Sequence, residues 1–118
     1  MIKYATIGRS KITRQFIEGA RLSGEMELVA VYSRSKENGL TFANDYGCKK
    51  VYTSLEDLAA DSEITAVYIA SPNVCHPRQT ELLLKGGKHV ICEKPIVTNA
   101  AEYKRLKELA DSLGLIYM

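Results

Sequence analysis

The start of the chain constrains its fold most strongly, because a short apolar segment there stops at a glycine and a helical pattern follows. The apolar residues fall between Ile2 and Ile7, Gly8 ends them, and the helical pattern consists of Ile12, Phe16, Ile17 and Ala20. Glycine takes backbone angles that a Cβ forbids, so the chain can turn sharply out of a central strand. The amides that open the next helix then point at one spot, with the helix dipole behind them, which suits a pyrophosphate. This stretch predicts the strand–turn–helix unit that begins a dinucleotide-binding domain.

The turn contains only part of the glycine fingerprint G-x-G-x-x-G. Gly8 stands at its first position, Ser10 at the second and Thr13 at the third. The second glycine normally lets the backbone approach the phosphate, and the third lets helix and strand pack closely. Ser10 adds bulk and also a hydroxyl that could donate to a phosphate. Thr13 fits less well, because it adds a branched side chain where little room is expected. Taken alone, the turn is compatible with a nucleotide site and equally with an ordinary strand–helix connection.

Size and composition indicate one globular domain, residues 1–118. The chain is 46% apolar and 25% charged, which is typical of soluble proteins. A net charge of +2 with both signs interspersed argues against a nucleic-acid-binding face, and no apolar run is long enough to span a membrane. Met1 leads directly into a strand without a signal peptide, and the three cysteines fit no metal spacing. We therefore expect a cytoplasmic protein with reduced thiols and no metal site.

The end of the second expected strand, residues 28–32, indicates which cofactor would bind. The strand is followed by Ser33, Arg34, Ser35 and Lys36, about where a dinucleotide fold meets the adenosine ribose. An acidic residue at this place binds the ribose 2′-hydroxyl of NAD, and none is present. Arg34 and Lys36 would instead suit the 2′-phosphate of NADP. Alternatively, Ser35 caps the next helix and Arg34 is simply solvated.

Helical and strand patterns alternate along the rest of the chain. Strands are expected at 50–52, 66–70, 88–92 and 115–118. Helices are expected at 36–46 with an interruption at Gly39, from a capping box at Thr53 and Glu56, from Asn73 to Leu84, and from Asn99 to Leu113. This alternation predicts an α/β fold with a doubly wound parallel sheet, whose ligands bind beyond the carboxyl ends of the strands. Four unusual polar stretches fall at those ends: residues 8–12, 33–36, 71–76 and 93–95.

Two segments carry a resemblance to a known family. Residues 67–73 read V-Y-I-A-S-P-N and are followed by His76, and residues 87–95 read G-K-H-V-I-C-E-K-P. In this combination, the chain resembles the Gfo/Idh/MocA oxidoreductases over its whole length. The family is named for glucose–fructose oxidoreductase and inositol dehydrogenase, and its members use NAD or NADP and act mostly on sugars and related polyols. The resemblance implies a Rossmann-type NAD(P)-binding domain.

The resemblance also implies site residues. The pyrophosphate would be lined by Gly8, Ser10, Lys11 and Ile12, and the adenosine ribose by Ser33, Arg34 and Lys36. The nicotinamide half would lie beside Ser71, Pro72, Asn73 and His76. Glu93 would approach the nicotinamide ribose, and Lys94 would be catalytic, because an ammonium beside the substrate can orient a hydroxyl and ease its proton loss. Two alternatives remain open: Glu93 and Lys94 could form a surface ion pair, and His76 could only assist the start of a helix.

Family enzymes carry a second domain that supplies most of the substrate pocket, and this chain stops where that domain would begin. We therefore expect the cofactor-binding part of an oxidoreductase that acts on a sugar, polyol or related compound, prefers NADP over NAD, and is inactive without the second domain. A stand-alone nucleotide-binding module, such as a sensor or partner subunit, is the main alternative. A Rossmann-like methyltransferase would need an acidic residue at the end of the second strand. Apolar surface near residues 115–117 further predicts a homo-oligomer.

Overall fold

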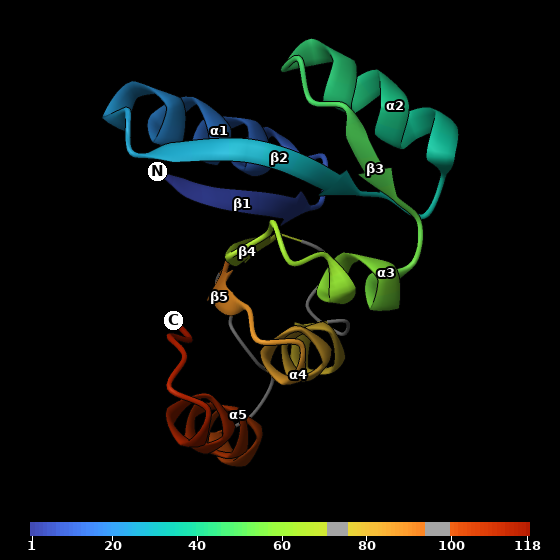
Figure 1. The fold of residues 1–118 in the computed structure, drawn as a ribbon. Helices are drawn as coiled ribbons and strands as arrows, with labels where there is room; N and C mark the ends of the chain where they lie inside the picture. Colours follow the sequence, from blue (N-terminus) through green and yellow to red (C-terminus); the bar gives the residue numbers. More distant parts are fainter. Residues whose placement is uncertain (71–75, 94–99) are drawn as a thin grey trace.

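The computed structural model describes residues 1–70, 76–93 and 100–118, with only the backbone of His76 (Figure 1). In these ranges five strands alternate with five helices. The strands are β1 (Ile2–Ile7), β2 (Met26–Tyr32), β3 (Lys50–Tyr52), β4 (Ala66–Ile69) and β5 (His89–Cys92). The helices are α1 (Lys11–Ser23), α2 (Lys36–Asp45), α3 (Leu55–Ala60), α4 (His76–Lys85) and α5 (Ala100–Ser112). None of the described helices is long and apolar enough to cross a membrane.

The strands form one parallel sheet in the order β3-β2-β1-β4-β5. The chain moves outward from β1 to β3 and then returns past β1 to β4, so the direction of winding reverses between β1 and β4. All carboxyl ends of the strands therefore lie along one edge, with the switch point in the middle of it. The predicted doubly wound α/β fold is confirmed.

Helices cover both faces of the sheet, with α1 and α2 on one face and α3, α4 and α5 on the other (Figure 1). Ala5 and Ile7 of β1 pack into the larger core with Leu58, Leu83 and other residues of α3, α4 and α5. Tyr4 points to the opposite face, where it packs with Ala20 of α1. Burial on both faces explains why β1 reads as an almost continuous apolar run rather than an alternating one.

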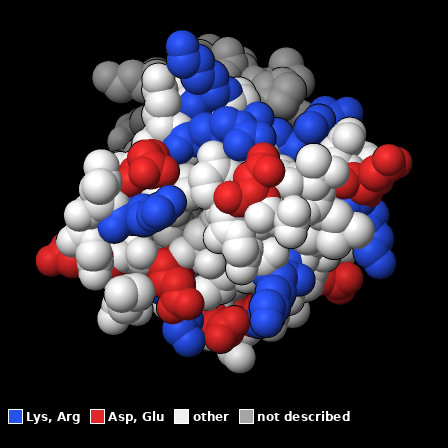
Figure 2. Space-filling view, turned by 90° about the horizontal axis from the view of Figure 1, so that it is seen from above, with Lys and Arg blue, Asp and Glu red and all other residues white. Residues whose placement is uncertain are grey.

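Charged side chains of both signs are scattered over the outside of α1 and α2. On the face in Figure 2, basic side chains gather along the upper edge, and acidic ones are interspersed with further basic ones over the rest. One ion pair on these helices joins Arg14 of α1 to Asp45 of α2 at 3.1 Å. The Arg14 guanidinium also lies 4.7 Å from the centre of the Phe42 ring. Exposed pairs of this kind stabilise little by themselves.

Three expected boundaries were wrong. Helix α2 runs through Gly39 without interruption, because this glycine is buried against Val51 of β3. Helix α3 is capped by Ser54, whose Oγ accepts from the Asp57 N–H at 3.3 Å, and not by Thr53. Residues 116–118 lie parallel to β5 with three backbone hydrogen bonds to Val90 and Cys92, but they form a single bridge, between Tyr117 and Val90, and not a full strand. The expected caps Asn73 and Asn99 lie outside the described residues.

Helices α3 and α4 approach each other very closely at the end of α4. A Cβ built on Gly86 would lie 2.9 Å from both the Cβ and the carbonyl oxygen of Ala59. Real Cβ atoms do not come so near to backbone atoms, so only glycine fits at this crossing.

Candidate functional site

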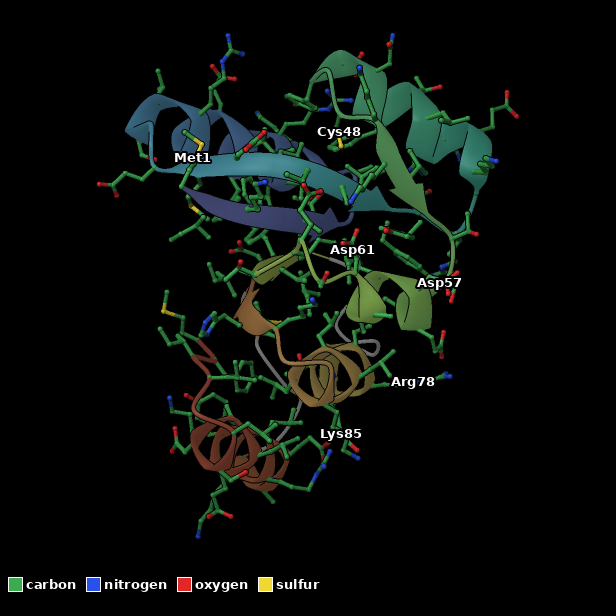
Figure 3. All side chains as sticks on the ribbon, viewed as in Figure 1. Met1, Cys48, Asp57, Asp61, Arg78 and Lys85 are labelled. Carbon is green, nitrogen blue, oxygen red and sulfur yellow. The ribbon has the colours of Figure 1, made fainter. Side chains whose placement is uncertain are left out.

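A cleft of about 1060 Å³ opens at the carboxyl edge of the sheet. It lies over the ends of β1 and β2 and is bordered by the starts of α1 and α3 and by one side of α4. Arg78, which extends from α4 in Figure 3, belongs to its wall. The residues that line it are Ile7–Ser10, Tyr32–Ser35, Asn38, Thr53–Glu56, Ala70, Arg78, Gln79 and Leu82. Its volume is in the range of sites for small molecules and cofactors.

Gly8 forms the turn out of β1 at the floor of this cleft, next to the end of β4. Its φ is +120°, and a Cβ there would lie 2.9 Å from the Ala70 carbonyl oxygen. The Ala70 N–H donates to the Ile7 carbonyl at 2.8 Å, which fixes the two strand ends together. The missing side chain lets the turn pack directly against the end of β4, and the turn itself lines the cleft beside the start of α1, a place that suits a phosphate.

Ser10 caps α1. Its Oγ accepts from the Thr13 N–H at 3.4 Å and lies 3.3 Å from the Thr13 hydroxyl. Thr13 is fully buried, so the expectation that its branched side chain would not fit was wrong. The Ser10 hydroxyl is exposed at the cleft, where it can still donate a hydrogen bond.

Replacing Ser10 with glycine is expected to change NADPH affinity by less than about 1 kcal/mol, because the loss of a hydroxyl donor and the gain in backbone access oppose each other. Glycine is also an acceptable cap, so the cost to folding is only a few tenths of a kcal/mol. Titration calorimetry on both proteins measures the effect. A loss of more than tenfold would instead identify the hydroxyl as a principal contact.

At the end of β2 the two expectations for residues 33–36 are compatible. Ser35 caps α2, with its Oγ accepting from the Asn38 N–H at 3.3 Å. Ser33 is buried, its N–H donates to the Tyr52 carbonyl at 3.0 Å, and its Oγ accepts from the Ser35 N–H. Arg34 lies between them and is exposed on the cleft. The loop is therefore held by its serines and presents a guanidinium to the site.

The other predicted site residues are placed differently. Of the described residues, Lys11, Ile12 and Lys36 lie exposed in the first turns of α1 and α2 and do not line the cleft. Glu93 also lies outside the lining, directly after β5, where its N–H donates to the Ile69 carbonyl at 2.9 Å. Ser71, Pro72, Asn73, Lys94 and the side chain of His76 lie outside the described residues.

Sequence reasoning missed several cleft residues, above all Arg9, Glu56 and Arg78. A cation inside the glycine turn is a signal that could have identified Arg9. Arg78 depends on how α4 packs on the sheet, and no local pattern reveals that. The Glu56 carboxyl has a lowered pKa because its own N–H and the Ser54 hydroxyl hydrogen-bond to it, with a smaller contribution from Arg78. With Arg34, the described part of the lining holds three arginines against one carboxylate, a balance that favours an anionic ligand.

Comparison with known proteins agrees with this geometry. The model of the oxidoreductase family with an NAD-binding Rossmann fold, Gfo/Idh/MocA, matches residues 2–118. The chain belongs to this family. It is the NAD(P)-binding Rossmann domain of a Gfo/Idh/MocA protein, as the sequence motifs predicted.

Several relatives are similar over most of this domain. An uncharacterized oxidoreductase of Escherichia coli is 53% identical over 86% of the chain and 31% of its own length. The scyllo-inositol 2-dehydrogenase (NADP(+)) of Bacillus subtilis is 40% identical over 100% of the chain and 36% of its own length. A 3-ketoreductase from Actinomadura kijaniata, solved with NADP, superposes with a TM-score of 0.93 at 27% identity, over 99% of this chain and 36% of that one. The chain thus spans about a third of the length of the relatives that it matches.

Proposed function

We propose that this domain prefers NADP and serves an oxidoreductase that transfers hydride between the nicotinamide and a sugar, polyol or related compound. The observation that carries the preference is Arg34, which is exposed on the cleft in a loop without an acidic residue. A guanidinium matches a 2′-phosphate in charge and geometry. The similarity to an enzyme named for NADP(+) supports the same choice.

The described residues fit the cofactor at two places. The turn at the start of α1, where Gly8, Arg9 and Ser10 line the cleft, suits the pyrophosphate. The loop after β2, with Arg34, suits the adenosine ribose and its phosphate. When bound, the cofactor supplies the nicotinamide that accepts or gives the hydride. In this proposal Lys94 orients the reacting hydroxyl, and a second domain provides the rest of the substrate pocket.

The preference is tested by titrating NADPH and NADH into the wild type and Arg34→Ala. We expect NADPH to bind at least tenfold more tightly to the wild type, because a charge-assisted contact contributes about 1.5–3 kcal/mol. The Arg34→Ala protein should lose most of this advantage and keep its affinity for NADH.

Arg21→Ala is the matched control. It removes the same charge from the last turn of α1, whereas Ser10 caps the other end of that helix. It should leave the preference intact. Equal affinities of the wild type for NADPH and NADH would contradict the proposal.

A further inference from the structure

Tyr68, near the end of β4, lies outside the cleft lining and is hydrogen-bonded to a predicted site residue. Its hydroxyl donates to Oε2 of Glu93, the residue that follows β5. Tyr68 is 4% exposed, and Glu93 is half-buried. The Glu93 N–H also bonds to the Ile69 carbonyl at 2.9 Å. Both the backbone and the side chain of Glu93 are thus attached to the end of β4.

Aromatic packing keeps the Tyr68 ring in place. The Phe16 ring of α1 stacks on it with the ring centres 3.9 Å apart and the planes 6° from parallel. The Tyr4 ring of β1 packs edge-on against the Phe16 ring, with the ring centres 5.6 Å apart. A ring that is buried and stacked in this way cannot swing aside, so its hydroxyl has a fixed position.

The chemistry of the pair assigns the donor. Burial, and then the hydrogen bond to the Glu93 carboxylate, raise the pKa of Tyr68 well above its usual range, so the phenol keeps its proton. Glu93 then accepts through Oε2, and Oε1 has lone pairs left for a second donor. A carboxylate fixed by one partner is well suited to accept from a neutral hydroxyl of a ligand.

The position of Glu93 indicates which part of the ligand that is. A dinucleotide crosses the switch point with its adenosine half on the β2 side. Its nicotinamide half then lies toward the ends of β4 and β5, where Tyr68 and Glu93 meet. We propose that Tyr68 is a positioning residue, which holds Glu93 in place to accept a hydroxyl of the nicotinamide ribose. This inference rests on the proposed function and adds a residue to the site.

The test compares two ligands on Tyr68→Phe, which keeps the stacked ring and removes only the hydroxyl. The ligands are NADPH and adenosine 2′,5′-bisphosphate, which carries only the adenosine half. We expect NADPH affinity to fall about three- to tenfold and the affinity for the bisphosphate to stay within twofold of the wild type. A purely structural role would weaken both ligands together, and unchanged NADPH affinity would also overturn the inference.

Two further variants complete the test. Tyr4→Phe removes a hydroxyl from the same aromatic cluster and should leave both affinities unchanged. In the Glu93→Ala background, which removes the acceptor, Tyr68→Phe should cause less than half of its effect on NADPH, because the two residues act as a unit. An undiminished effect would show that Tyr68 acts by another route. If the wild type binds NADPH and NADH equally, only the cofactor preference fails, and the same comparison is made with NADH and ADP.

Discussion

Replacing Gly8 with alanine is expected to destabilise the folded domain by about 3 kcal/mol, from backbone strain and overpacking together. At a φ of +120° a side chain is strained in any surroundings. The new Cβ would also lie 2.9 Å from the Ala70 carbonyl oxygen and 3.0 Å from its carbon. These are backbone atoms held by the β1–β4 ladder, so they cannot move away cheaply. Denaturant unfolding followed by circular dichroism measures the loss.

Gly19→Ala is the matched control, because Gly19 lies inside α1 and a Cβ there meets nothing within 4 Å. It should stabilise the domain by about 0.5–1 kcal/mol, since alanine favours a helix over glycine. The Gly8→Ala protein should also lose NADPH binding, because the turn that we propose as the pyrophosphate site is displaced. Stability within about 0.5 kcal/mol of the wild type would contradict this account of the turn.

Asp61→Asn is expected to cost up to about 2 kcal/mol at neutral pH, reduced by solvent around its partner Lys50. Asp61 follows α3 beside the sheet (Figure 3) and accepts from the Tyr52 hydroxyl at 2.5 Å and the Lys50 Nζ at 3.0 Å. The Tyr52 hydroxyl is the main reason that the pKa of Asp61 is lowered to about 2 from 3.8. Because the folded pKa lies below the unfolded one, this stability is fully present above pH 4 and is lost as the pH falls toward 2.

Unfolding free energies measured between pH 7 and pH 2.5 test this prediction. The wild type should lose stability below pH 4, and Asp61→Asn should show a shallower loss over the same range. Asp45→Asn is the control, because Asp45 is a largely exposed partner of Arg14 and its removal should cost less than about 0.5 kcal/mol. The same acid-induced loss in Asp61→Asn and the wild type would show that other groups cause it.

The sequence predicted the order of elements because each carries a strong local pattern. Gly8 after an apolar run, and Ser35 before a helix, are signals that act over a few residues. The start of α3 was harder, because Thr53 and Ser54 can both cap a helix. Strand β3 continues to Tyr52, which pairs with Tyr32. The helix begins only at Leu55, with Ser54 as its cap. Residues 115–118 have strand-like composition, and residues 116–118 do lie parallel to β5 with three backbone hydrogen bonds, but the pairing amounts to a single bridge.

Some residues of the candidate site could likewise be predicted from local sequence patterns, and others could not. Gly8, Ser10, Ser33 and Arg34 follow strand ends, so the topology alone brings them to one edge, and all four line the cleft. Arg78 and Gln79 reach it only through the packing of α4 on the sheet, which no short-range pattern encodes. Thr13 was misjudged because the space beneath a helix start depends on the tertiary fold. The cofactor contacts of all these residues remain predictions.

The crossing at Gly86 limits how far the two helices beside the cleft can move relative to each other. Residues 54–56 at the start of α3 and Arg78 to Leu82 on α4 form two walls of the cleft, and these helices meet where Ala59 packs against Gly86, which has no side chain. Helices packed this closely cannot move nearer to each other, and a tilt of either helix would open a void in the core. We therefore expect α3 and α4 to move together as one rigid unit. In the proposed function, adjustment between a dinucleotide with the extra phosphate and one without it then falls to the long side chains of Arg34 and Arg78, which line the cleft and can change rotamer without moving the backbone.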